Sequence, residues 1–143
     1  MDFKEMIKKN TIRTISLFSG AGGLDIGAIR AGANIIWAND IKQDACESYR
    51  TNIGDHIHIG DINMYVDDFS AISNVDLVIG GPPCQGFSVA GKMDRNDERS
   101  KLIWNYVDVV EATNPKAFIM ENVKALATLS RWQKVRDKLL LRL

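Results

Sequence analysis

The stretch "RTISLFSGAGGLDIGAIRAG", residues 13–32, decides the fold, because an apolar run leads through a glycine-rich turn into a helical pattern. Residues 13–18 combine β-branched Thr14 and Ile15 with apolar Leu17 and Phe18, which predicts a strand. Residues 22–32 predict a helix in which apolar positions alternate with small residues, and Gly32 suits its C-terminal end. A strand joined to a helix in this way is the first part of an α/β unit.

The rest of the chain repeats this alternation without internal repeats or a linker. Strands are predicted at 34–39, 56–59, 74–80 and 116–120, and helices at 42–53, 98–113 and 124–143. Alternating strands and helices predict an α/β fold with a doubly wound, mostly parallel sheet and helices on both faces. A length of 143 residues is enough for one domain with its own core.

Composition excludes several classes of protein. Hydrophobic residues make up 45% and charged residues 25%, and no apolar run approaches the ~20 residues of a membrane span. The charged start "MDFKEMIKKN" lacks the apolar core of a secretion signal, which favours a cytoplasmic location. Only two cysteines occur, without a Cys-x-x-Cys pair, so we expect neither structural zinc nor a disulfide scaffold. A net charge of zero gives no general attraction to nucleic acid.

The glycine turn and the acids that follow it predict a cofactor site. The spacing Gly20-x-Gly22-Gly23 differs from the dinucleotide pattern G-x-G-x-x-G, because Asp25 stands at the last glycine's place. Asp40, at the end of the second strand, could accept hydrogen bonds from ribose hydroxyls. Ile41 could lie against an adenine, and Asp61 in "GDI" could accept from an exocyclic amine. These residues indicate a nucleoside-containing cofactor, and both a dinucleotide and S-adenosylmethionine remain open.

The stretch "GGPPCQGFS", residues 80–88, places a cysteine after two prolines at the carboxyl end of a predicted strand. Ligands bind at such ends in an open α/β sheet. Cys84 is therefore a candidate nucleophile, although free cysteines are often small core residues. Cys46 lies in the middle of a predicted helix, away from any turn, and we interpret it as structural.

The motifs "FSGAGG", "ND", "GDI", "GGPPCQGFS" and "ENV" occur in the order and approximate spacing of the cytosine-5 DNA methyltransferases. The chain resembles that family from about residue 13 to residue 125. Amino-directed DNA methyltransferases instead carry Asp, Asn or Ser before Pro-Pro and an aromatic residue. The resemblance implies an S-adenosylmethionine-dependent methyltransferase with a Rossmann-like fold that acts on carbon 5 of cytosine in double-stranded DNA. It also implies a bacterial modification enzyme that works in the cytoplasm, at the nucleoid.

Carbon 5 of cytosine is a poor nucleophile, which explains the need for a thiol. Addition of a thiolate to carbon 6 makes the ring an enamine, so that carbon 5 can attack a sulfonium methyl group. By the resemblance, Cys84 is this nucleophile and Glu121 contacts the cytosine N3. Asn122 would orient the loop or the base, and Pro83 would fix the backbone before the thiol. The target cytosine must leave the DNA helix to reach this pocket.

The resemblance assigns a larger set of binding residues. Those for the cofactor are Phe18, Gly20, Ala21, Gly22, Gly23, Leu24, Asp40, Ile41, Asp61, Ile62 and Leu102. Residues 85–99 form a polar, glycine-containing stretch, in which Gln85, Ser88, Lys92 and Arg99 are candidate DNA contacts. Outside the site, we interpret His56 and His58 as the polar side of a strand. Arg131, Arg136 and Arg142 are expected on a solvated helix face.

The family pattern continues beyond "ENV", so we expect residues 1–143 to be the N-terminal part of a catalytic domain, without a target-recognition region. The sheet would be incomplete at its C-terminal side, with "AFIM" (117–120) as an exposed apolar edge. A complementary C-terminal chain would then be a partner, and the isolated chain would be inactive. Three other functions remain open: a non-catalytic S-adenosylmethionine-binding or assembly subunit, a tRNA cytosine methyltransferase, and a nicotinamide oxidoreductase. The glycine spacing and Cys84 count against the last of these.

Overall fold

The structure, a computed structural model, describes residues 5, 11–83 and 98–143, without the side chains of residues 98–100 and 131. The strands are β1 (Ile12–Leu17), β2 (Ala33–Asp40), β3 (Ile57–Ile59), β4 (Leu77–Gly80) and β5 (Ala117–Met120). The helices are α2 (Gly23–Arg30), α3 (Gln43–Asn52), α4 (Val66–Ala71), α5 (Glu98–Thr113), α6 (Lys124–Thr128) and α7 (Gln133–Arg142). Two 3-10 helices, η1 (Ile62–Tyr65) and η2 (Ser130–Trp132), complete the described elements.

The five strands form one sheet in the order β3-β2-β1-β4-β5, and all four pairings are parallel. Successive strands run from β1 outward to β3 on one side, and β4 and β5 lie on the other side of β1. This is the doubly wound arrangement that the alternation of elements predicts. The predicted α/β class is confirmed, and helix α5 has the predicted bounds.

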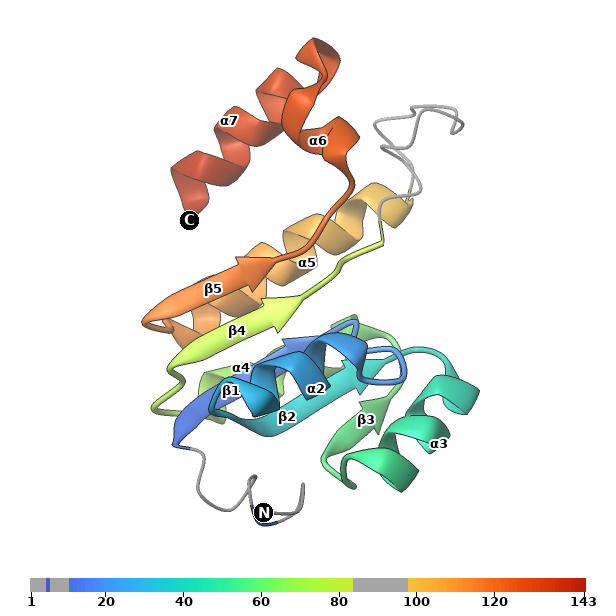
Figure 1. Ribbon diagram of the computed structural model, residues 1–143. Coiled ribbons are helices and arrows are strands. Elements are labelled where there is room, and N and C mark those ends of the chain that lie inside the picture. The colour runs from blue at the N-terminus through green and yellow to red at the C-terminus, as the bar shows by residue number, and fades with distance from the viewer. Residues whose placement is uncertain (1–4, 6–10, 84–97) are drawn as a thin grey trace.

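Among the described helices, α2 and α3 cover one face of the sheet, and α4 and α5 cover the other (Figure 1). On one face, Ile29 of α2 and Tyr49 of α3 pack with strand residues such as Ile35 and Ile79. On the other face, Phe69 of α4 and Tyr106 of α5 belong to a second core cluster with strand residues such as Ile15, Leu17 and Val78. Side chains alternate across each strand, so the central strands are buried on both faces.

Three predicted element ends, in one helix and one strand, are displaced by residues with positive φ. The helix predicted over 22–32 spans only Gly23–Arg30, because Gly22 (φ 93°) and Gly32 (φ 109°) have left-handed backbones. The strand predicted from residue 74 begins at Leu77, since Asn74 has φ 57°. A left-handed residue cannot continue a strand or a right-handed helix. No element was predicted for 61–73, where η1 and α4 form.

The predicted single helix over 124–143 is wrong. It is divided into α6, η2 and α7, because Leu129 is extended (φ −81°, ψ 131°). One core cluster contains Leu126, Trp132 and Leu139 together with Ile103 and Val107 of α5. The chain bends so that its apolar residues reach one surface.

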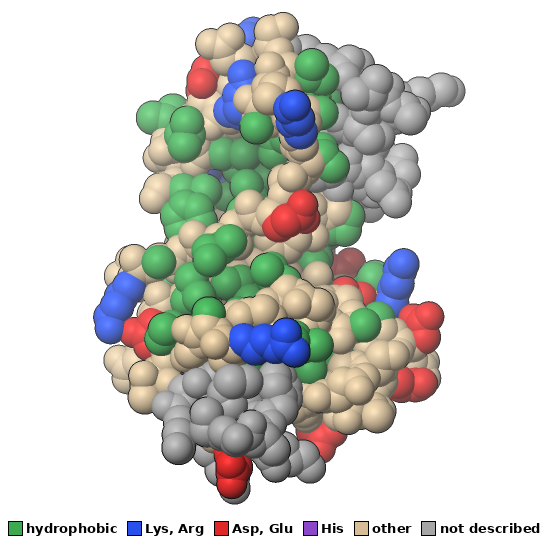
Figure 2. Space-filling model, in the orientation of Figure 1, with side chains coloured by type: hydrophobic (Ala, Val, Ile, Leu, Met, Phe, Trp, Pro, Cys, Tyr) green, Lys and Arg blue, Asp and Glu red, His purple; other side chains and the backbone are tan. Residues whose placement is uncertain are grey.

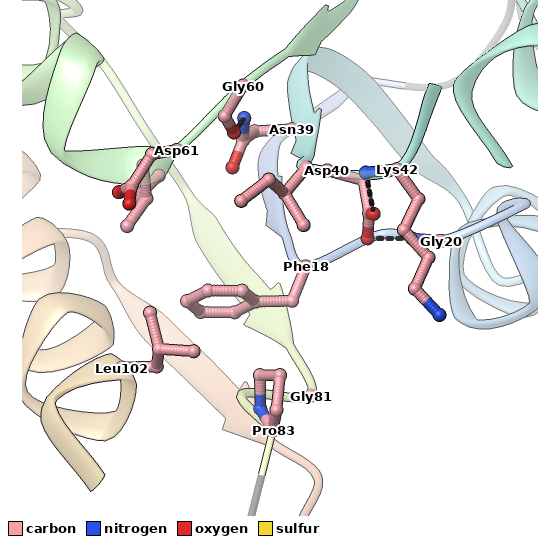
Figure 3. A pocket seen from close by; sticks show the side chains of 12 residues that line it. Phe18, Gly20, Asn39, Asp40, Lys42, Gly60, Asp61, Gly81, Pro83 and Leu102 are labelled. Carbon is pink, nitrogen blue, oxygen red and sulfur yellow. Dashed lines mark hydrogen bonds between the residues drawn. The ribbon is translucent and has the colours of Figure 1, made fainter. Parts of the chain in front are cut away.

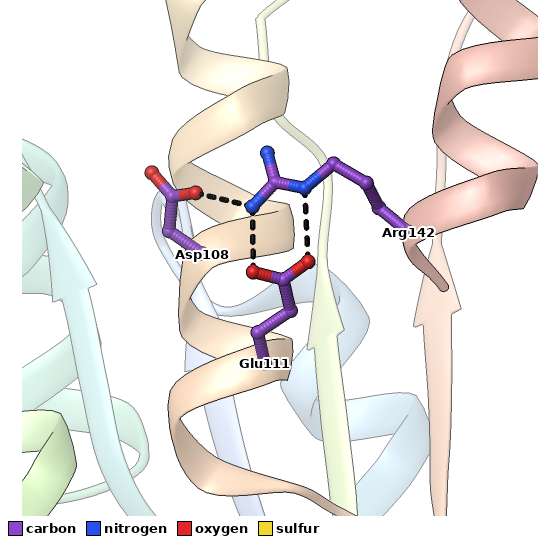
Figure 4. A network of polar contacts seen from close by, with 3 residues as sticks. All are labelled: Asp108, Glu111 and Arg142. Carbon is purple, nitrogen blue, oxygen red and sulfur yellow. Dashed lines mark hydrogen bonds and ion pairs between the residues drawn. The ribbon is translucent and has the colours of Figure 1, made fainter.

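Of the arginines expected on a solvated helix face, Arg142 is exposed, whereas Arg136 is half-buried. Arg136 donates from Nη1 to the carbonyl oxygens of Leu126 and Leu129, both at 2.8 Å. Arg142 joins the end of α7 to α5 through Asp108 (2.8 Å) and Glu111 (2.6 Å), as Figure 4 shows. The Arg131 side chain lies outside the described residues. Arg136 thus joins α7 to α6, and Arg142 joins α7 to α5, although ion pairs this exposed contribute little individually.

The predicted exposed apolar edge is present at β5, which pairs only with β4 among the described strands. Ile119 is 53% and Phe118 38% exposed. Ile119 is the β5 partner of Ile79 on β4, so both side chains lie on the same face of the sheet. Ile79 belongs to the core cluster of α2, which covers this face nearer the centre of the sheet. In the described part of the chain, no helix lies over β5 on that face (Figure 1), and Figure 2 shows hydrophobic side chains gathered there. The β5 face is thus an apolar surface open to a covering element.

The alternating sequence predicts that His56 and His58 lie together on the polar side of a strand. In the structure they do not. His56 lies before the strand and packs edge-on against Tyr49, with ring centroids 5.5 Å apart. His58 stacks on Trp37 at 4.9 Å. Both are half-buried, and burial lowers the pKa of each. Neither histidine is therefore a solvated strand residue.

Candidate active site

The glycine turn after β1 is joined directly to the end of β2 by Asp40. The Asp40 carboxylate accepts from the backbone N–H of Gly20 at 2.8 Å and from that of Lys42 at 2.9 Å, as Figure 3 shows. Gly20 has φ 56°, a conformation that glycine adopts without steric cost. One side chain therefore sets the positions of two neighbouring loops at the carboxyl edge of the sheet.

A cavity of about 270 Å³ opens at this edge, where β1, β2, β3 and β4 end. Its lining residues come from five segments: Phe18, Gly20, Asn39, Asp40, Ile41, Lys42, Gly60, Asp61, Ile62, Gly81, Pro83 and Leu102. In Figure 3, Phe18 and Leu102 point into the cavity from opposite elements, and Asp40 and Asp61 lie along its rim. The cavity thus has apolar walls and carboxylates at separate points. It lies at the switch point of the sheet, where α/β proteins bind ligands.

Asp61 is the second carboxylate of this cavity. It lies directly after the loop that ends β3, and its Oδ1 accepts from the backbone N–H of Asn63 at 2.8 Å and from Asn63 Nδ2 at 2.7 Å. Asn39, which is buried, donates from Nδ2 to the carbonyl oxygens of His58 (3.0 Å) and Gly60 (2.9 Å). These bonds fix the loop that presents Asp61.

A buried carboxylate lies beneath the glycine turn. Asp25 is fully buried and accepts from Ser16 Oγ at 2.7 Å and from the Tyr49 hydroxyl at 2.6 Å. Ser16 also lies 2.9 Å from the hydroxyl of Ser19, in the turn itself. Burial raises the pKa of Asp25, and the two hydroxyl donors act in the opposite direction. Asp25, which stands at the place of the third glycine of the dinucleotide pattern, therefore stabilises the packing of α2 and the glycine turn against the core.

The end of β5 lies beside the end of β4, as their parallel pairing requires. The Glu121 carboxylate lies over Gly81, where a Cβ atom would be 3.1 Å from Oε2. Asn122 donates from Nδ2 to the carbonyl oxygen of Pro82 at 3.3 Å and accepts from the N–H of Val123 at 2.8 Å. A second cavity, of about 200 Å³, includes Glu121, Gly81, Leu24, Asp25 and four residues of 16–19. An acid and an amide thus stand directly beside the Gly-Pro-Pro turn.

Comparison with known proteins decides the family. The model of C-5 cytosine-specific DNA methylases matches residues 12–140. The chain belongs to this methylase family. It is 42% identical over 129 residues to the Type II methyltransferase M.NgoFVII of Neisseria gonorrhoeae, covering 90% of this chain and 34% of the relative. It is 43% identical over 127 residues to the Type II methyltransferase M.AquIA of Picosynechococcus sp., covering 83% of this chain and 51% of the relative.

Solved structures support the same assignment. A putative DNA modification methyltransferase encoded within an E. coli prophage matches with a TM-score of 0.76 and 31% identity, over 93% of this chain and 38% of that one. The S. pombe Dnmt2 methyltransferase matches with a TM-score of 0.67 and 27% identity, over 92% of this chain and 39% of that one. The chain therefore has the methyltransferase fold. It spans about a third of the length of most curated relatives that it matches.

For this member of the methylase family, the structure brings together most of the predicted cofactor residues. Phe18, Gly20, Asp40, Ile41, Asp61, Ile62 and Leu102 line one cavity, together with Pro83. Ala21, Gly22 and Gly23 do not line it, and Leu24 lines the neighbouring cavity. Gly22 lies against α3, since a Cβ there would be 2.1 Å from Ile53 Cδ1. Its role in the structure is close packing of the turn.

Several predicted site residues lie outside the described residues: Cys84, Gln85, Ser88, Lys92 and the side chain of Arg99. Sequence reasoning missed Asn39, Lys42 and Gly60 at the cavity, and Gly81 beneath Glu121. Asn39 belongs to the "ND" motif, of which only the acid was assigned a function. Among the described residues, no group of three or more potential metal-ligating side chains occurs. No helix in the described ranges is both long and apolar enough to cross a membrane.

Proposed function

We propose that this chain forms the cofactor-binding and catalytic part of a cytosine-5 DNA methyltransferase. The observation that supports the proposal most strongly is one cavity that combines two apolar walls and two carboxylates at four strand ends, with Glu121 on the adjacent strand end. The chain spans about a third of most relatives' length, so activity is proposed for the assembled enzyme. By "assembled enzyme" we mean this chain together with the segments that correspond to the remaining length of the relatives. Those segments could lie on the same chain or on a second one.

The cavity fits S-adenosylmethionine by the chemistry of its lining. Phe18 and Leu102 offer apolar surfaces for the two faces of an adenine, with Ile41 at its edge. Each oxygen of Asp40 already accepts one backbone donor and retains capacity for a ribose hydroxyl. Asp61 has its Oδ2 available for an exocyclic amine. The bound cofactor would supply an electrophilic methyl group. A dinucleotide-binding turn typically has glycine or alanine at the place of buried Asp25.

In the proposed reaction, the Cys84 thiolate adds to carbon 6 of a flipped cytosine, and a carbon–sulfur bond forms. The electron pair of the former double bond moves into the ring, and Glu121 promotes protonation at N3, which neutralises the developing charge. Carbon 5 would then attack the sulfonium methyl group, so that the sulfur–methyl bond breaks and S-adenosylhomocysteine is the leaving group. Loss of the carbon-5 proton to water re-forms the double bond and expels the thiolate. Asn122 contributes by holding the carbonyl of Pro82, two residues before the nucleophile.

The apolar β5 face supports the proposal that this chain works with further segments. Ile119, Phe118 and Val123 are all at least 38% exposed on or next to the last strand of the sheet. A complementary chain or segment that covers β5 would bury this surface and would supply the base-reading region. Residues 1–143 would then be the N-terminal part of the catalytic domain, within a modification enzyme acting on DNA.

The test is methyl transfer by the assembled enzyme from tritiated S-adenosylmethionine to mixed-sequence duplex DNA and, in parallel, to tRNA. The proposal expects label at carbon 5 of cytosine in DNA. Label in tRNA alone would instead identify a tRNA methyltransferase. Binding of the cofactor without transfer to either substrate would favour a non-catalytic subunit.

A further inference from the structure

A chain of polar side chains joins α5 to the carboxylate of Asp61. Asn105, on α5, donates from Nδ2 to Oδ1 of Asn63 at 2.6 Å. Asn63 in turn donates to Asp61 Oδ1 from its side-chain Nδ2 (2.7 Å) and from its backbone N–H (2.8 Å). The two asparagines are 42 residues apart in sequence, so only the tertiary fold brings them together.

The direction of these bonds determines how Asp61 is presented. An asparagine amide has a donating end and an accepting end. Because Asn105 donates to the oxygen of Asn63, the Asn63 amide turns its nitrogen toward Asp61. Both donors of Asn63 then act on the same oxygen, Oδ1, and no hydrogen bond from a described residue reaches Oδ2. The second oxygen is thereby left as the acceptor for a ligand in the cavity.

Helix α5 also forms a wall of the same cavity. Leu102 lines it, and Asn105 follows three residues later, so the two side chains lie on neighbouring positions of one helix face. Helix α5 thus supplies two things: Leu102 forms an apolar wall for a ligand, and Asn105 supports Asp61 through Asn63. A displacement of α5 would change both together.

We propose that Asn63 and Asn105 are positioning residues, which orient Asp61 and thereby set how strongly the cavity selects a purine with an exocyclic amine over one with a carbonyl. The proposal rests on the function proposed above, in which Asp61 accepts from the cofactor's amine. A carboxylate oxygen attracts an amine donor and repels a carbonyl oxygen at the same place. Selection therefore depends on Oδ2 being held at one point, and a freely rotating carboxylate would discriminate less.

The test compares two ligands that differ only at this group. Calorimetry on the assembled enzyme would measure the Kd of S-adenosylhomocysteine and of S-inosylhomocysteine, which has a carbonyl in place of the amine. For the unmodified enzyme we expect a preference of at least about tenfold for the adenosyl form, since hydrogen bonds to charged groups contribute about 1.5–3 kcal/mol. Asn63→Ala, Asn105→Ala and the equal-sized Asn105→Asp should each reduce the preference to about threefold or less.

Leu102→Ala is the matched control, because it removes a wall of the cavity without touching the carboxylate. It should weaken both ligands by a similar factor and leave their ratio unchanged. A large preference that persists in Asn105→Ala and Asn105→Asp would overturn the positioning role while leaving the cofactor site in place. An unmodified enzyme that binds both ligands equally would remove Asp61 from amine recognition, and the positioning role with it. Binding of neither ligand would overturn the proposed cofactor site itself.

Discussion

The side chain of Asp40 and the backbone of Gly20 are joined by a 2.8 Å hydrogen bond that connects the end of β2 to the glycine turn after β1. The two residues are 20 positions apart, and the strands that lead to them, β1 and β2, are adjacent and parallel. The same carboxylate accepts from the N–H of Lys42. Asp40 is thus a structural junction at the rim of the cavity as well as the proposed partner of a ribose.

Asp40→Ala should weaken S-adenosylmethionine binding by about 10- to 100-fold, because charge-assisted hydrogen bonds of about 1.5–3 kcal/mol are lost. The loss would include both the ribose contact and the arrangement of the turn. Calorimetry on the assembled enzyme would measure it. Asp44→Ala, which changes an exposed acid on the first turn of α3, should leave the affinity unchanged. Unchanged affinity in Asp40→Ala, or tighter binding of NAD than of S-adenosylmethionine, would contradict the assignment.

Cys84 should become covalently attached to DNA that contains 5-fluorocytosine, because fluorine cannot leave as the carbon-5 proton does. Cys84→Ala should abolish the adduct. Cys46→Ala should retain it, since Cys46 is a fully buried residue of α3 and burial raises the pKa of its thiol. Denaturing electrophoresis of the assembled enzyme with labelled DNA would report the adduct. An adduct that persists in Cys84→Ala would assign the nucleophile elsewhere.

Gly22→Ala and Gly27→Ala should have opposite effects on stability. Gly22 has φ 93°, and a Cβ there would lie 2.1 Å from Ile53 Cδ1, so we expect a loss of about 1–3 kcal/mol from strain and overpacking. Gly27 lies inside α2, where an added Cβ would meet no heavy atom within 4 Å, and alanine should stabilise the helix by up to about 1 kcal/mol. Urea denaturation of the two variants would measure the difference. Equal midpoints would contradict the packing described for the turn.

The free energy of unfolding should fall as the pH drops below about 6.5. Burial lowers the pKa of His56 and of His58 in the folded state, so the unfolded chain takes up protons first. Their contribution is complete above the ordinary pKa of 6.5 and is lost as the pH falls through the lower folded values. Nearby Asp55 and Asp68 oppose the shifts without reversing them.

Urea titrations at pH 7.5 and 5.5 would test this dependence. The double variant His56→Gln, His58→Gln should lose less stability between the two pH values than the unmodified chain. The difference between the two proteins removes the contribution of carboxylates that titrate in both, including buried Asp25, to the change in the free energy of unfolding. A variant with the same pH dependence as the unmodified chain would show that the histidines do not control it.

The 143-residue chain by itself should not methylate DNA and should self-associate through β5. Ile119 and Phe118 are exposed on the edge strand, which is a surface prone to pairing. Ile119→Lys should reduce self-association in sedimentation experiments, whereas Val66→Lys, at an exposed position on α4, should not. Turnover by the isolated chain that disappears in Cys84→Ala would contradict the need for further segments.

Local sequence patterns were sufficient for the architecture of the sheet. Alternating apolar runs and helical patterns predicted five parallel strands, and the amphipathic pattern of 98–113 gave helix α5 with its observed bounds. The motifs after β1, β2, β3 and β4 were expected at one edge, because the carboxyl ends of parallel strands lie together. Asp40, Ile41 and Asp61 could be assigned for that reason, since they follow β2 and β3 closely, whereas Phe18 and Leu102 were expected from the family resemblance.

The sequence by itself determined which residues stand at the strand ends, and tertiary structure decided what they contact. Residues 124–143 read as one helix, but packing of Trp132 and Leu139 on α5 divides it, since burial of apolar surface outweighs local helix propensity. Asn105 reaches Asn63 only because the fold brings α5 beside η1. The periodicity of apolar residues in a local stretch indicates whether it forms a helix or a strand. Contacts between distant residues depend on how these elements pack, which no local stretch specifies.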